Sequence, residues 1–204
     1  MPRRSDDAYD THPSVALACV EWLARNTAPP QRVLDPTAGA GPFVRAARAC
    51  WPEAKIAAVD IRGDVQAEAH AAGANVSLTA DALQLPADLV GMCDLIVTNP
   101  PFCIADQLLL HLYPAMREGA RLAFLLSVTW LGSKERWEPG GAWVTAPLAS
   151  LSVIVPRPHF GMSHSPKFEA GLFVWVKGHT GPAYLADPIR WSPPRKERKR
   201  KTAA

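Results

Sequence analysis

The chain has 204 residues and a net charge of +3. This length is sufficient for one large domain and too short for two of ordinary size. Its hydrophobic fraction of 48% and charged fraction of 20% are typical of a soluble globular protein, and no segment approaches the ~20 consecutive apolar residues of a membrane helix. The first residues also lack the apolar segment of a secretory signal.

The four cysteines lie far apart in the sequence and include no Cys-x-x-Cys pair. This spacing argues against a zinc site and against a disulfide framework. We therefore expect a cytoplasmic protein without a bound metal, in which all four cysteines are buried free thiols: Cys19, Cys50, Cys93 and Cys103.

Apolar runs and helical patterns alternate along the chain from residue 13 onward. In chain order they predict helix 13–27, strand 32–35, helix 43–50, strand 55–61, helix 64–72, strand 75–80, strand 94–98, helix 104–117, strand 121–128, and strands 151–155 and 172–176 as an antiparallel pair. Continuous apolar strands separated by helices favour an α/β fold with a Rossmann-like, doubly wound and mostly parallel seven-stranded sheet that carries helices on both faces.

The same patterns predict one domain over residues 1–178 and a Pro-rich, basic C-terminal tail over 179–204. Within the domain, segments 129–150 and 157–170 interrupt the alternation, and we expect both to face a substrate. The first segment contains three tryptophans that we expect to pack it onto the sheet, with a contact to nucleic acid as the alternative: Trp130, Trp137 and Trp143.

Segment 195–201 of the tail carries six basic residues and one acid, whereas the rest of the chain is close to neutral. A near-neutral body with a basic tail suggests contact with a polyanion. A solvated terminus without a binding role is the alternative.

Polar side chains follow four of the predicted strands: Asp35, Asp60, Asp81 and Asn99. The carboxyl ends of parallel strands meet at one edge of a sheet, where ligands bind in this fold class. Asp60 can accept hydrogen bonds from both hydroxyls of a ribose, and Asp81 with its neighbours can accept from an adenine amino group. Alternatively, each acid caps the helix that follows it.

The first of these strands ends in a glycine turn, Asp35-Pro36-Thr37-Ala38-Gly39-Ala40-Gly41. Glycine permits backbone conformations and close approaches that a Cβ would block. Val44 stands where a dinucleotide fingerprint has its third glycine, and no Gly-Lys-Ser/Thr sequence follows, so the turn predicts neither a dinucleotide nor a phosphate site.

Residues Asn99-Pro100-Pro101-Phe102 follow the strand predicted at 94–98. Two prolines stiffen this corner by fixing φ and removing two N–H donors. The Asn99 Oδ1 atom and a proline carbonyl can then accept the two N–H groups of a planar amine, while the Phe102 ring stacks on its face.

Taken in order, the Asp-Pro-x-x-Gly-x-Gly turn, Asp60, Asp81 and Asn-Pro-Pro-Phe resemble the S-adenosyl-L-methionine-dependent N6-adenine DNA methyltransferases with the gamma-type motif order, including those of phages and prophages. The resemblance covers about residues 9–177, and Thr11 falls in a segment that in this group contacts the methionine end of the cofactor. It implies that the following residues bind S-adenosyl-L-methionine: Thr11, Asp35, Pro36, Ala38, Gly39, Gly41, Phe43, Asp60, Ile61, Asp81, Ala82 and Asn99.

The resemblance also implies methyl transfer to the exocyclic N6 of adenine, catalysed by the Asn99-Pro100-Pro101-Phe102 corner. A paired adenine cannot reach such a corner, so the base must be flipped or single-stranded. We expect DNA, in preference to RNA, to contact Arg157 through a phosphate and Phe160 through a base, unless Phe160 belongs to the core. Further nucleic-acid contacts are expected from Lys167, Arg195, Lys196, Arg198 and Lys199.

Two other functions fit the same residues. Asn-Pro-Pro-aromatic corners also occur in methyltransferases that act on rRNA or tRNA bases and on protein glutamines, although here no helical substrate domain is expected ahead of residue 13. The other function is a non-catalytic subunit that binds the cofactor or nucleic acid, which has no need of an intact catalytic corner. With only segments 129–150 and 157–170 and the tail to read a target, we expect weak sequence preference and steep salt dependence.

Overall fold

The computed structural model describes residues 11–158 and 169–193 of the chain. Its α-helices are α1 (Pro13–Asn26), α2 (Pro42–Cys50), α3 (Gln66–Ala71), α4 (Ala87–Gly91), α5 (Ala105–Ala115) and α6 (Ala142–Thr145). Its strands are β1 (Arg32–Asp35), β2 (Lys55–Asp60), β3 (Val76–Thr79), β4 (Leu95–Thr98), β5 (Arg121–Ser127), β6 (Leu148–Val155), β7 (Ala170–Val176), β8 (Tyr184–Leu185) and β9 (Ile189–Arg190). Short 3₁₀ helices are η2 (Gly63–Val65), η3 (Ala82–Gln84), η4 (Phe102–Ile104), η5 (Val128–Gly132) and η6 (Lys134–Trp137).

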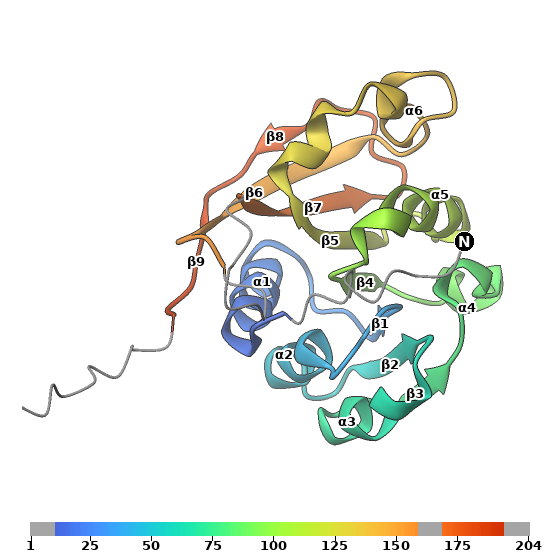
Figure 1. Cartoon of the computed structure of the whole chain (residues 1–204), viewed down its shortest axis with the longest axis vertical. Helices are drawn as coiled ribbons and strands as arrows, with labels where there is room; N and C mark the ends of the chain where they lie inside the picture. Colours follow the sequence, from blue (N-terminus) through green and yellow to red (C-terminus); the bar gives the residue numbers. More distant parts are fainter. Residues whose placement is uncertain (1–10, 159–168, 194–204) are drawn as a thin grey trace, which may run out of the picture.

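One sheet runs through the centre of the molecule in the order β3-β2-β1-β4-β5-β7-β6-β8, with β9 also paired to β6 (Figure 1). The pairs from β3 to β5 are parallel, whereas β7 is antiparallel to both β5 and β6. The doubly wound, mostly parallel fold is therefore confirmed, and so is the antiparallel pairing of the last two predicted strands. The described residues form nine strands instead of the expected seven, because β8 and β9 add to the edge of β6.

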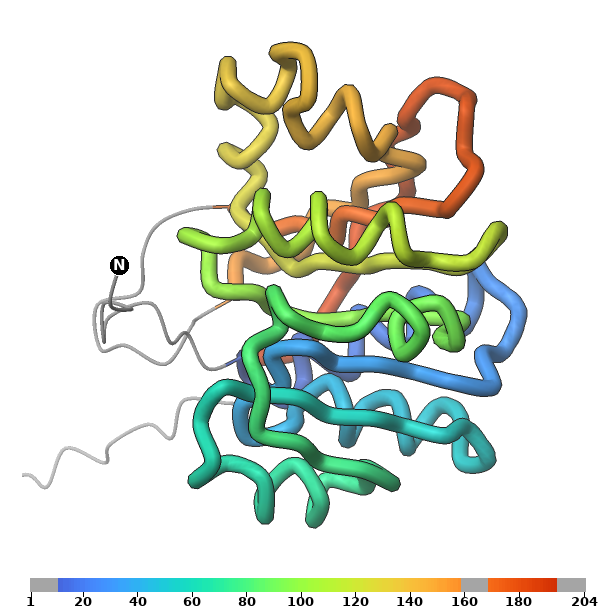
Figure 2. Tube along the Cα trace, turned by 90° about the vertical axis from the view of Figure 1, so that its right-hand side faces the viewer, coloured from blue at the N-terminus to red at the C-terminus, as the bar shows by residue number. Residues whose placement is uncertain are grey.

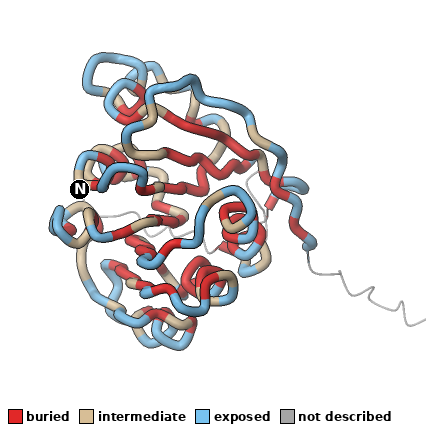
Figure 3. Tube along the Cα trace, turned by 180° about the vertical axis from the view of Figure 1, so that it is seen from behind, coloured by how far each residue is buried: buried red, intermediate tan, exposed pale blue. Residues whose placement is uncertain are grey.

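Helices cover both faces of the sheet, and alternate strand residues pack against opposite layers. Ala123 and Leu125 of β5 belong to the core beneath α1, α2 and α3. Leu122 and Phe124 belong to the core shared with α4, α5 and α6. Figure 3 shows the central strands as mostly buried and the outer sides of the helices as exposed, whereas the edge strands β3 and β8 are largely exposed. Burial on both faces is why the central strands β4, β5 and β7 appear in the sequence as mostly apolar runs.

The segment expected to be an irregular insertion contains η5, η6 and α6, and its last residues begin β6. It lies beside α5 at the top of the molecule (Figure 2). Trp130 and Trp143 are 6% and 8% exposed and pack edge to face at 4.9 Å between ring centroids, next to Phe173 of β7. These two side chains anchor the segment on the sheet as expected, whereas Trp137 is 63% exposed and rests against Trp143.

Part of the segment that the sequence predicts to be a tail, after Gly178, contributes to the sheet and the core. Strands β8 and β9 pair in parallel with β6, and Ile189 and Trp191 are almost completely buried against the α1 layer. The Trp191 indole Nε1 donates a hydrogen bond to the Pro156 carbonyl at 2.6 Å. The structured part of the chain therefore continues to at least residue 191.

Among the cysteines, Cys19 and Cys93 are buried free thiols, and burial raises the pKa of Cys19 to about 12 and of Cys93 to about 11. Cys50 is half-buried, and Cys103, which belongs to η4, is exposed. The expectation of burial is thus wrong for Cys103 and holds only in part for Cys50. In residues 11–158 and 169–193, no helix combines the length and apolar character that crossing a membrane requires.

Candidate functional site

The predicted polar residues line one edge of the sheet, at the carboxyl ends of four adjacent strands. Asp35 and Asp60 are the last residues of β1 and β2, Asn99 follows β4 directly, and Asp81 comes two residues after β3. Since β3, β2, β1 and β4 are neighbours and parallel, these side chains share one edge of the molecule.

The glycine turn between β1 and α2 has the backbone that the sequence predicts. Gly39 and Gly41 adopt φ values of +53° and +76°, which other residues rarely adopt. A Cβ on Gly41 would lie 2.8 Å from the Cβ of Ala72, so glycine is also required for the close approach of α2 to α3. Ala38, in the same turn, donates its N–H to the Val59 carbonyl of β2 at 2.9 Å, which ties the turn to the neighbouring strand.

Asp60 is held by two neighbours at the end of β2. Its Oδ2 accepts the Gly39 N–H at 2.9 Å, and its Oδ1 accepts the Arg62 backbone N–H at 2.9 Å and the Arg62 Nε–H at 3.1 Å. Burial opposes ionisation of this carboxyl, but the Arg62 and Gly39 hydrogen bonds outweigh it and lower its pKa. A ribose at Asp60 would therefore meet a carboxylate that already binds Arg62.

Asp35 is almost completely buried beneath the turn, with 1% of its surface exposed. Burial raises its pKa to about 7, against the effect of hydrogen bonds from the Thr98 side chain and from the Thr37 backbone N–H. The Thr37 and Thr98 hydroxyls are 2.6 Å apart, and Thr37 Oγ1 also approaches the Asn99 carbonyl at 3.5 Å. These contacts link the glycine turn to the end of β4.

The remaining predicted cofactor residues differ in accessibility. Asp81 accepts the Leu83 N–H at 2.9 Å and caps η3, which is the alternative role predicted for this acid from the sequence. Ile61 is 46% exposed beside Asp60, so its side chain is open to a ligand. The side chains of Pro36, Ala38, Phe43 and Ala82 are buried, which leaves their backbone as the available contact.

The Asn-Pro-Pro-Phe corner leads from β4 into η4. Asn99 Nδ2 donates to Thr11 Oγ1 at 3.0 Å, and the Ile104 N–H donates to the Pro101 carbonyl at 3.1 Å. Because the Pro101 carbonyl already accepts this hydrogen bond, the Pro100 carbonyl is the better candidate acceptor for an amine. Phe102 is half-buried against the α5 side of the core.

Three residues in these contacts are absent from the sequence-based predictions: Thr37, Arg62 and Thr98. Thr37 lies within the glycine turn and Thr98 directly precedes the Asn-Pro-Pro-Phe corner, so their positions in the sequence could have indicated that they belong to the site. The position of Arg62 two residues after Asp60 was a weaker signal, because its contact depends on how the chain turns after β2.

Of the residues predicted to contact nucleic acid, Arg157 lies in the described part of the chain. Arg157 is exposed and forms an ion pair with Glu169, so its charge is already compensated. The other predicted residues lie outside the described part of the chain: Phe160, Lys167, Arg195, Lys196, Arg198 and Lys199.

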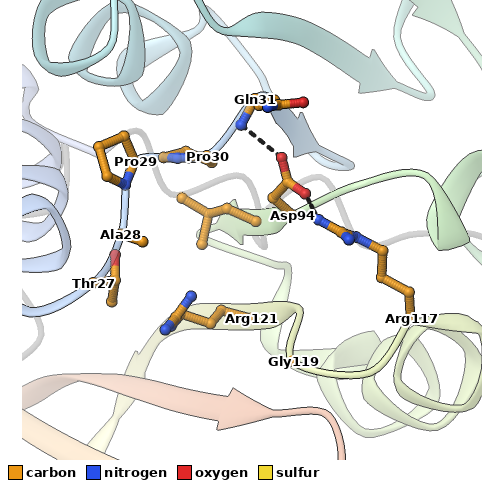
Figure 4. Close-up of a pocket in the computed structure, with 10 residues that line it drawn as sticks. Thr27, Ala28, Pro29, Pro30, Gln31, Asp94, Arg117, Gly119 and Arg121 are labelled. Atoms are coloured by element: carbon orange, nitrogen blue, oxygen red, sulfur yellow. Dashed lines mark hydrogen bonds and ion pairs between the residues drawn. The ribbon is translucent and has the colours of Figure 1, made fainter.

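A pocket of about 320 Å³ opens at the opposite edge of the sheet (Figure 4). It is lined by the loop before β1 and by Asp94, Arg117 and Arg121, which lie at the amino ends of β4 and β5. Asp94 accepts the Gln31 N–H at 2.6 Å and pairs with Arg117. None of the polar strand ends contributes to this pocket. Over the described ranges, no group of three or more His, Cys, Asp or Glu side chains is arranged to hold a metal ion.

Comparison with solved structures identifies the fold. A predicted O-methyltransferase from Agrobacterium tumefaciens superposes with a TM-score of 0.64 at 18% identity, over 86% of this chain and 86% of its own. A modification subunit assigned to a type I restriction enzyme from Vibrio vulnificus gives a TM-score of 0.65 at 16% identity, over 90% of this chain and 48% of its own. TrmN from Thermus thermophilus gives 0.56 at 22% identity, over 79% of this chain and 48% of its own.

The chain thus has the fold of class I methyltransferases, and it spans about half the length of the last two proteins. No protein-family model matches the sequence, and no curated protein matches it.

Proposed function

We propose that this protein transfers a methyl group from S-adenosyl-L-methionine to the exocyclic N6 of an adenine in DNA. One observation carries the proposal: the Asn99 corner lies next to the glycine turn, and the Thr37 hydroxyl bridges the two, contacting Thr98 at 2.6 Å. A methyl donor above the turn and an amine at the corner would then be neighbours. The methyltransferase fold supports the donor, and the chemistry of the corner supports the amine.

On the donor side, the Gly39–Gly41 backbone leaves room for the cofactor, and Asp60 would accept from the ribose hydroxyls. Arg62 must then exchange its Nε–H bond to Asp60 for another contact, which its 42% exposed side chain allows. When ionised, the carboxylate of Asp35 beneath the turn would stabilise the positively charged end of the cofactor.

On the acceptor side, an adenine amine is a poor nucleophile because its lone pair is delocalised into the ring. Hydrogen bonds to Asn99 Oδ1 and to the Pro100 carbonyl would favour a tetrahedral nitrogen whose lone pair faces the methyl group. Phe102 would stack on the base, which must leave a duplex to reach the corner. Positioning and electrostatics would supply most of the rate enhancement.

DNA is the favoured substrate because one structural neighbour is a restriction-modification subunit and the basic segment 195–201 suits a polyanion. RNA bases and protein glutamines present similar planar amines. The assay therefore offers labelled S-adenosyl-L-methionine with DNA, rRNA or protein, followed by nucleoside and amino-acid analysis. Label in N6-methyladenine from DNA is expected, and label confined to RNA or glutamine would contradict the proposal.

Asn99→Ala provides the first variant test. Because this change removes the side-chain acceptor without altering the glycine turn, we expect methylation to fall below detection and cofactor affinity to stay within a few-fold. Asn26→Ala, at the far end of α1, is the matched control and keeps full activity. Loss of cofactor binding in Asn99→Ala would mean that the active site is not at this corner as proposed.

A further inference from the structure

The amide of Asn99 contacts Thr11 through its donor end. A side-chain amide has one donor end and one acceptor end, and the two are related by a half-turn. Asn99 Nδ2 donates to Thr11 Oγ1 at 3.0 Å, so the acceptor Oδ1 faces the other way. This oxygen has less than 1 Å² of exposed surface in the structure, and the orientation leaves it as the acceptor for the amine of a substrate.

Thr11 is itself held firmly, although it lies outside any helix or strand. Its side chain is 7% exposed, and it stands directly before His12, the N-cap of α1. His12 Nδ1 accepts the Ser14 N–H at 3.2 Å, which fixes the start of the helix. The hydroxyl of Thr11 is thus placed by the first turn of α1.

The carboxyl-terminal segment supports the same turn. The ring of His12 packs against Trp191 with 5.6 Å between centroids, and Trp191 is anchored by its hydrogen bond to the Pro156 carbonyl. Trp191 and nearby Ile189 are both buried against the α1 layer. Two segments distant in sequence therefore converge to place one hydroxyl beside Asn99.

We propose that Thr11 is a positioning residue for Asn99: it accepts the Nδ2–H of the amide and so turns Oδ1 toward the amine of the substrate. The inference rests on the proposed function and deepens it. It differs from the expectation drawn from the sequence resemblance, in which Thr11 contacts the methionine end of the cofactor. The two roles predict different kinetic effects, because one acts on the chemical step and the other on cofactor binding.

The test compares Thr11→Val, which keeps the shape and removes the hydroxyl, with Thr11→Ser, which keeps the hydroxyl. For a lost hydrogen bond at the catalytic amide, we expect Thr11→Val to lower kcat roughly tenfold or more. The KM for S-adenosyl-L-methionine should stay within about twofold, and Thr11→Ser should recover most of kcat. Thr27→Val, at the other end of α1, is the matched control and should retain wild-type kinetics.

A spectroscopic measurement follows the amide directly. The side-chain ¹⁵N–¹H₂ signals of Asn99, assigned by their loss in Asn99→Ala, should shift in Thr11→Val and return close to the wild-type position in Thr11→Ser. The control Thr27→Val should leave them unchanged. This readout does not depend on turnover.

Two results, obtained with an active wild-type protein, would overturn the inference and leave the proposed function standing. In the first, Thr11→Val leaves both kcat and the amide signals of Asn99 unchanged. In the second, Thr11→Val raises the KM for the cofactor while kcat is kept. A wild-type protein that folds and binds cofactor but makes no N6-methyladenine would instead reject the proposed function and the inference with it.

Discussion

Two neighbouring carboxyls at the sheet edge respond to their surroundings in opposite ways. Asp60 receives hydrogen bonds from Arg62 and Gly39 that overcome its burial, so its pKa is lowered. Asp35 is more deeply buried, and the hydrogen bonds from Thr98 and Thr37 do not offset the loss of solvation, so its pKa rises to about 7. Near neutral pH, Asp60 is ionised while Asp35 is divided between its two forms.

This difference predicts how stability and cofactor binding depend on pH. A carboxyl whose folded pKa is raised binds protons more tightly in the folded than in the unfolded state, so stability is lost as the pH rises toward the folded pKa of about 7. Asp35 should make the free energy of unfolding about 2 kcal/mol smaller at pH 8 than at pH 5.5. Asp35→Asn should remove this component, as denaturant titrations at both pH values would show.

The same ionisation should strengthen binding of a cationic cofactor. We expect the affinity of the wild type for S-adenosyl-L-methionine to rise between pH 6 and pH 8, because Asp35 acquires its charge in that interval. Asp35→Asn should bind more weakly and without this pH dependence. Calorimetric titrations that show the same slope for both proteins would contradict the assignment of Asp35 to the cofactor site.

At the scale of elements, one arginine fastens the segment between β5 and β6 to α5. Arg136 donates to both carboxylate oxygens of Asp106, at 2.6 and 2.9 Å, and to the Trp130 carbonyl at 2.7 Å. Its guanidinium also lies 4.3 Å from the centre of a Trp130 ring. A bidentate pair of this kind fixes geometry as well as contributing energy.

Arg136→Met keeps much of the aliphatic stem and removes every one of these polar contacts. Because a hydrogen bond to a charged group contributes about 1.5–3 kcal/mol, we expect a loss of about 2 kcal/mol in the free energy of unfolding. Lys134→Met, which removes only the exposed pair with Glu138, is the matched control and should cost less than about 0.5 kcal/mol. Equal effects in urea titrations would show that Arg136 does not anchor the segment.

The elements themselves were largely predictable, and the reasons are visible in particular strands. All four residues of β4 are buried, and three of them are the consecutive apolar residues Leu95, Ile96 and Val97, so the strand was visible in the sequence ahead of polar Thr98 and Asn99. Strands β8 and β9 could not be predicted, because a two-residue strand has no periodicity. Two contacts of the site could not be predicted either. The Arg62–Asp60 contact depends on how the chain turns after β2, and the Thr11–Asn99 contact joins residues 88 positions apart in the sequence.

At the scale of the whole molecule, strands β8 and β9 and the buried residues Ile189 and Trp191 belong to the folded body. Removing residues 179–204 would expose the core that Ile189 and Trp191 cover, and it would free the edge of β6. We expect that truncation to lower the melting temperature by several degrees, since burying one large side chain is worth about 1.5–3 kcal/mol.

Removal of residues 194–204 alone is the control for stability and a test of the basic segment. The melting temperature should stay close to that of the full chain, because every described buried residue is kept. Affinity for DNA should fall. The slope of the logarithm of the binding constant against the logarithm of the salt concentration should become shallower by about 0.9 for each lost phosphate contact. An unchanged salt dependence would assign the basic residues no role in binding.

The pocket beside Arg121 and the Asn99 corner lie at opposite ends of the same parallel strands. The exposed loop before β1 is therefore a natural attachment point for a sensor surface or a fluorophore. A protein immobilised through Gln31 would keep its glycine turn and proline corner, at the other end of the strands, facing away from the attachment surface.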